Sequence, residues 1–86
     1  MSIDAQVFAQ AGEAMFGEEW KSPMADLLGM DVRTVRRIAK AAWEGAEYPI
    51  NPTLGPVLAQ HLTSFVAEMG PRLATAQGLI DRLNGH

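Results

Sequence analysis

The sequence predicts an all-α fold, a small helix-turn-helix bundle of about five helices. Three observations lead to this prediction. Apolar residues recur at spacings of three and four, no segment alternates apolar and polar residues as a strand would, and Gly and Pro divide the chain into helix-length pieces. With 86 residues and no Cys, the chain has room for one domain, residues 1–86, without disulfides or thiolate zinc sites.

The first helix is expected to end near Gly17, with Ser2 or Asp4 as its N-cap. Trp20 follows at the junction with the next helix, and we interpret it as an anchor of the core, since its large ring is most often buried at such a place.

A short second helix is expected from Ser22-Pro23, in which Ser caps free N–H groups and Pro takes the first helical position. Gly29 ends this helix, because a residue at that position often needs a positive φ. Met30 turns inward and Asp31 caps the helix that follows.

The third helix, from Val32 to Trp43 or Glu44, carries most of the chain's positive charge. Four of the seven basic residues fall on one face of it, within an arc of roughly 100°. These four are Arg33, Arg36, Arg37 and Lys40. Residues 21–40 carry a formal charge of +3, whereas the whole chain carries −3. A confined basic patch on an acidic protein favours local, oriented binding to nucleic acid, and a solvated helix face is the alternative.

A stiff loop with two prolines precedes a fourth helix, expected from Leu54 with Thr53 as its cap. Gly70-Pro71 is expected to break or kink this helix, so that a final helix extends from Pro71 to Leu83. An apolar seam with alternating spacings of four and three crosses that point. Its members are Leu62, Val66, Met69, Leu73, Ala76, Ile80 and Leu83.

Such a seam is typical of paired helices, and its partner is either the first helix or a second copy of the chain. We favour the second copy, because one small core does not use every apolar face. Residues 53–84 are therefore predicted to form a dimerisation region. Its interface residues are expected to be Leu62, Val66, Met69, Leu73, Ile80 and Leu83.

Residues 21–39, KSPMADLLGMDVRTVRRIA, resemble the helix-turn-helix of the Cro/repressor superfamily. Five of its packing and turn positions match, namely Ala25, Gly29, Met30, Val35 and Ile38. Residues 16–50 are similar to short DNA-binding regulators of bacteria, phages and other mobile elements, in Trp20, residues 27–29, residues 33–37 and Pro49-Ile50. The resemblance covers about half the chain and implies a helix-turn-helix unit at 21–44 with a recognition helix at 32–43.

A recognition helix inserts its N-terminal residues deepest into the major groove of double-stranded DNA. We therefore assign Arg33 and Arg37 to base edges, together with Arg36, which either reads a base or clamps a phosphate. Val32 is expected to touch a thymine methyl group. Phosphate contacts are expected from Lys21, Ser22, Thr34 and Lys40.

No nucleophile elbow, phosphate-binding glycine loop or carboxylate pair is present, and we do not expect an enzyme. His61 and His86 have no partners at ligand spacing, so neither metal nor cofactor is expected. The chain contains neither an apolar run of about 18–20 residues nor a signal-peptide pattern, which favours the cytoplasm and no membrane partner.

These observations predict a dimeric repressor that reads an inverted repeat, controls its own synthesis and takes no small-molecule ligand. Two alternatives stay open. One is an architectural DNA-binding factor of the excisionase type. The other is a helix-turn-helix used as a scaffold for protein–protein contact, as in an antitoxin.

Overall fold

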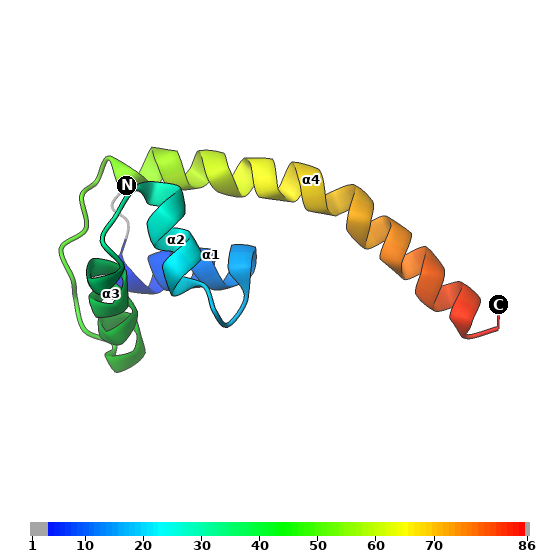
Figure 1. The fold of residues 1–86 in the computed structure, drawn as a ribbon, viewed down its shortest axis with the longest axis horizontal. Coiled ribbons are helices and arrows are strands. Elements are labelled where there is room, and N and C mark those ends of the chain that lie inside the picture. The colour runs from blue at the N-terminus through cyan, green and yellow to red at the C-terminus, as the bar shows by residue number, and fades with distance from the viewer. Residues whose placement is uncertain (1–3, 86) are drawn as a thin grey trace.

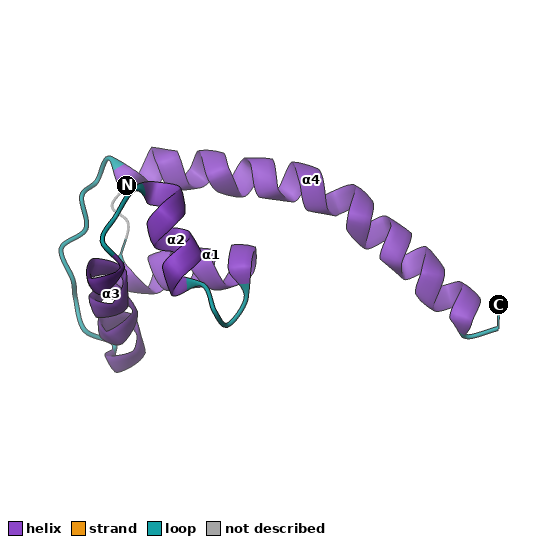
Figure 2. Ribbon diagram, in the orientation of Figure 1, coloured by secondary structure: helices purple, strands orange, loops and turns teal. Residues whose placement is uncertain are grey.

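The computed structural model describes residues 4–85, which form four α-helices and no strand. The helices are α1 (Ala5–Phe16), α2 (Lys21–Leu28), α3 (Val32–Glu44) and α4 (Leu54–Leu83). Figures 1 and 2 show α1, α2 and α3 gathered at one end of the molecule, with α4 passing over them and continuing beyond. The all-α prediction is confirmed, but the predicted number of helices is not.

The core lies where α1, α2 and α3 meet. Its fully buried large side chains come from all three helices, and they are Phe8, Met24, Val35 and Ile38. Trp20 is only 4 % exposed and meets Phe8 edge to face, with 6.2 Å between ring centroids. The prediction that Trp20 anchors the core is confirmed.

Two aspartates fix where α1 and α3 begin. Asp4 Oδ1 accepts a hydrogen bond of 2.8 Å from the N–H of Val7, and Asp31 Oδ1 accepts one of 2.8 Å from the N–H of Arg33. Each bond satisfies a backbone donor that the first helical turn leaves free. Both predicted caps are confirmed, and the alternative cap Ser2 lies outside the described residues.

The predicted cap of α2 is wrong. The helix begins at Lys21, after an N-cap residue, Trp20, whose side chain makes no capping hydrogen bond. The Trp20 carbonyl already accepts from the N–H of Met24 at 2.9 Å, so Ser22 is the second residue of the helix and not its cap. Pro23 still lies in the first turn, where its missing donor costs little.

The turn between α2 and α3 follows the prediction. Gly29 adopts the left-handed conformation with φ 65°, a region that favours Gly because it has no Cβ. The N–H of Met30 then donates to the Ala25 carbonyl at 2.9 Å, and the Met30 side chain packs against the core. This turn sets the direction in which α3 leaves α2.

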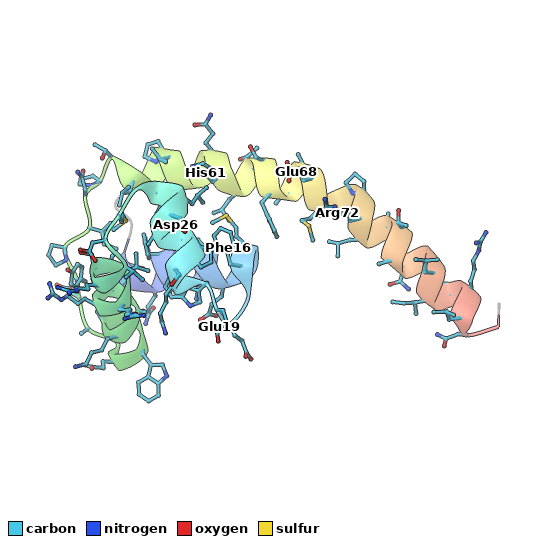
Figure 3. The ribbon with its side chains drawn as sticks, viewed as in Figure 1. Phe16, Glu19, Asp26, His61, Glu68 and Arg72 are labelled. Carbon is cyan, nitrogen blue, oxygen red and sulfur yellow. The ribbon has the colours of Figure 1, made fainter. Side chains whose placement is uncertain are left out.

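Gly70-Pro71 does not break the helix, contrary to the expectation of a separate fifth helix. Pro71 lies inside a continuous 30-residue α4. Proline disfavours a helical conformation in the preceding residue partly through that residue's Cβ, and Gly70 has none. In Figure 1 the unbroken ribbon changes direction in this region, and Figure 3 places Arg72 at the bend. The bend is what a helix shows where a proline removes one backbone hydrogen bond.

The two halves of α4 have different surroundings. Leu58 is buried, and Leu54 and Leu62 pack against the core. Leu62, a predicted residue of the dimer interface, therefore makes its apolar contact within one copy of the chain. Every residue from 70 to 85 is exposed. The Cα radius of gyration is 15.8 Å. A compact domain of this length has a radius of gyration of about 12 Å. The second half of α4 therefore projects from the body.

Gly12 is the position where α1 touches the Trp20 ring. A Cβ on Gly12 would lie 2.2 Å from Trp20 Cε3, so the buried ring or the helix would have to shift. We expect Gly12→Ala to lower the free energy of unfolding by about 1–3 kcal/mol, although Ala is the better helix former. Urea denaturation followed by circular dichroism measures this. Gly78→Ala is the matched control, because its Cβ would meet nothing within 4 Å and it should not destabilise.

Candidate nucleic-acid interface

Helix α3 is strongly amphipathic. Val35, Ile38 and Ala41 are buried against the core, and the four basic side chains, Arg33, Arg36, Arg37 and Lys40, are all exposed. The spacing of three between the buried residues keeps them on one side of the helix, so the basic residues necessarily face out. Each end of the helix is fixed, by the Asp31 cap and by Gly45 with φ 69°. The structure thus presents the basic arc on a rigid element.

One flank of this arc meets the start of α2. Arg36, Lys40 and Trp43 of α3 line a shallow depression together with Lys21 of α2, and Ala39 is also part of its lining. Lys21 and Arg36, fifteen positions apart in the chain, are therefore brought to one place. Lys21 is a predicted phosphate contact, and for Arg36 the sequence leaves the choice between base and phosphate open. The shared depression therefore places Arg36 next to a predicted phosphate contact.

Arg33 and Arg37 occupy the other part of the arc. They lie about 60° and 100° around the helix axis from Arg36. Both are exposed and four residues apart, so they point in similar directions on adjacent turns. The basic residues thus form two groups, with Arg33 and Arg37 in one and Arg36 and Lys40 near Lys21 in the other.

Acidic residues border the second group. Glu18 and Glu19, in the turn before α2, line a depression with Lys21, Ser22 and Arg36, and Figure 3 shows Glu19 on the side of the body away from α4. These carboxylates lower the positive potential at the start of α2, where a phosphate is expected.

Lys40 Nζ lies 3.8 Å from Glu44 Oε1, and both side chains are at least half exposed. An exposed pair of this kind contributes little to stability, and a phosphate oxygen can replace the glutamate. The spacing of four residues already indicates this pair in the sequence, but the predicted role of Lys40 takes no account of it.

Two predicted contacts are only partly accessible. The Val32 side chain packs against the core and is half-buried, which leaves part of it for a thymine methyl group. Thr34 is also half-buried, and its N–H already donates to the Asp31 carbonyl at 3.0 Å. Ser22 is exposed on the first turn of α2.

Trp43 is the residue that the sequence-based assignment leaves without a role beyond ending the helix. Its side chain is 89 % exposed and borders the depression shared with Lys21, Arg36 and Lys40. The spacing of Arg36, Lys40 and Trp43, at four and three, is the signal that places them on one face.

Within residues 4–85 no three His, Asp or Glu side chains are grouped as a metal ion would need. No helix in this range has the length and apolar character to cross a membrane. Comparison of the chain with protein-family models, with curated proteins and with solved structures gives no match.

Proposed function

We propose that the protein is a sequence-specific DNA-binding regulator of transcription that places α3 in the major groove. The observation that carries this proposal is the exposed basic arc on α3, in a chain whose overall charge is −3. An acidic protein is repelled by DNA except where such an arc faces it, so the arc selects the binding orientation. The Cro/repressor-like turn between α2 and α3 supports the same orientation.

The two groups of basic residues suit two different tasks. Arg33 and Arg37 lie in the N-terminal half of α3 and line neither depression beside α2. Side chains in this half of a recognition helix reach base edges, and Arg matches the two acceptors of guanine. Arg36 and Lys40 lie beside Lys21, in the position of a flank that follows the phosphates of one strand. Arg36 is therefore assigned to phosphate in this proposal.

A dimer is part of the proposal, because the projecting half of α4 has no partner within residues 4–85. Its large apolar residues are each at least half exposed, and these are Leu73, Leu79, Ile80 and Leu83. Residues 71–83 extend for about 20 Å as a helix, a length that is marginally stable alone in water. A second copy of α4 would cover this face, and self-association would make repression depend on the concentration of the protein itself.

Selection from a randomised duplex library, followed by sequencing, tests the proposal. The expected result is an inverted repeat whose half-site centres lie about 10 bp apart or a multiple of this distance, since each copy reads one face of the double helix. Enrichment of one asymmetric site would favour the architectural alternative. No enrichment, together with no binding at low salt, would contradict DNA binding altogether.

A further inference from the structure

Trp43 is a large apolar side chain placed in a charged environment. It is 89 % exposed, and the residues that share its depression include Lys21, Arg36, Lys40 and Glu44. Trp at a protein–protein contact is usually surrounded by other apolar groups that exclude water. One depression beside Trp43 is lined by three cations, one anion and Ala39. A second depression beside it is lined by small apolar residues, among them Ala39 and Ala42, and by Lys21 and Glu13. A partner that covers Trp43 must therefore offer both negative charge and a small apolar surface.

The remainder of the molecule does not cover this residue. Figure 1 shows the end of α3 on the side of the body opposite to α4, and α3 and α4 do not pack against each other. Pairing of two chains through α4 therefore leaves Trp43 in solvent. The basic arc, in contrast, continues directly into Trp43, because Arg36, Lys40 and Trp43 share one face of α3.

We propose that Trp43 binds the sugar–phosphate backbone of duplex DNA, an inference that rests on the proposed function. The indole packs against the C–H surface of a deoxyribose, and its Nε1–H donates to a phosphate oxygen. Lys21, Arg36 and Lys40 neutralise phosphates of the same strand. Glu44 exchanges its contact with Lys40 for water when the phosphate arrives. In this interface the apolar ring of Trp43 binds DNA beside the positive charges on the flank of α3.

The fluorescence of the two tryptophans tests this directly. Trp20 is buried and Trp43 is exposed, so acrylamide should quench mainly Trp43 in the free protein. A saturating scrambled-sequence duplex at low salt should protect Trp43 from acrylamide, because the contact does not depend on sequence. Trp43→Phe leaves Trp20 as the only tryptophan and supplies the background of the measurement.

Binding of a dye-labelled scrambled duplex, followed by anisotropy, gives the second measurement. Trp43→Ala should weaken binding about tenfold through lost apolar contact. Trp43→Phe, which keeps a ring and loses one donor, should weaken it about threefold. Neither change removes a charge, so the dependence of affinity on salt should keep its slope. Val57→Ala, an exposed apolar residue of α4, is the matched control and should bind like the parent.

If the parent binds the duplex but acrylamide quenching stays the same, or if Trp43→Ala binds like the parent, the inference is wrong while the proposed function stands. If the parent binds no duplex at low salt, both are wrong. If Trp43→Ala changes the mass in light scattering, Trp43 lies between copies of the chain, and the inference is overturned.

Discussion

Replacing Leu73 and Ile80 together with Asp is expected to turn the proposed dimer into a monomer. Both residues lie on the exposed apolar face of the projecting half of α4. In a paired helix they would be buried, and a buried carboxylate without a partner is strongly unfavourable. The monomer should still fold, because neither residue belongs to the core formed by α1, α2 and α3. Light-scattering mass measures the change.

The same variant should lose most of its affinity for an inverted repeat. Two linked DNA-binding domains bind with an affinity about a hundredfold or more higher than one domain alone, because the second domain binds at a high effective concentration. Affinity for an isolated half-site should stay near that of the parent. Ala74→Asp is the matched control, because Ala74 is exposed and lies about 100° and 120° around the axis of α4 from Leu73 and Ile80. A parent that stays monomeric at about 100 µM would contradict the dimer and leave DNA reading by α3 intact.

The body of the protein follows from local signals in the sequence. Asp31 and Gly45 bound α3 because a cap acceptor and a residue tolerant of positive φ are short-range requirements, and the observed bounds agree with the prediction. The inward position of Val35 and Ile38 follows from helical spacing alone. These features depend on neighbouring residues, which a sequence displays directly.

The errors arise where one local rule competes with another. Ser22 is of a residue type that caps helices well. The Trp20 carbonyl nevertheless accepts the first hydrogen bond of the helix, so α2 begins at Lys21, earlier in the chain than predicted. Pro71 is a helix breaker in general, yet Gly70 before it removes part of the steric conflict and α4 continues. A list of propensities does not rank such competing effects.

The sequence predicts which residues belong to the candidate site, but it does not predict which of them lie together in space. The basic arc of α3 follows from spacing, whereas the approach of Lys21 to Arg36 depends on how α2 crosses α3. The same crossing brings Glu18 and Glu19 near that flank. Contacts between separate helices are tertiary, so no local pattern in the sequence indicates them.

This grouping predicts two kinds of loss when the basic residues are removed one at a time. Arg33→Ala or Arg37→Ala should cost about 1–3 kcal/mol on the selected duplex and relax its preference at one base pair, because each removes a base contact. Lys40→Ala should weaken binding to selected and scrambled duplexes alike, and lower the log–log salt slope by about one unit per contact. Arg36→Ala should resemble Lys40→Ala, since Arg36 lies beside Lys21.

Titration of each variant against both duplexes at several salt concentrations separates the two losses. Circular dichroism should first show each variant folded, which we expect because all four side chains are exposed. Glu44→Gln is the control of opposite sign, since it removes the carboxylate 3.8 Å from Lys40 Nζ and should strengthen binding to every duplex. If all the basic-residue variants bound like the parent, α3 would not read DNA, and the helix-turn-helix would instead be a scaffold for contact with another protein.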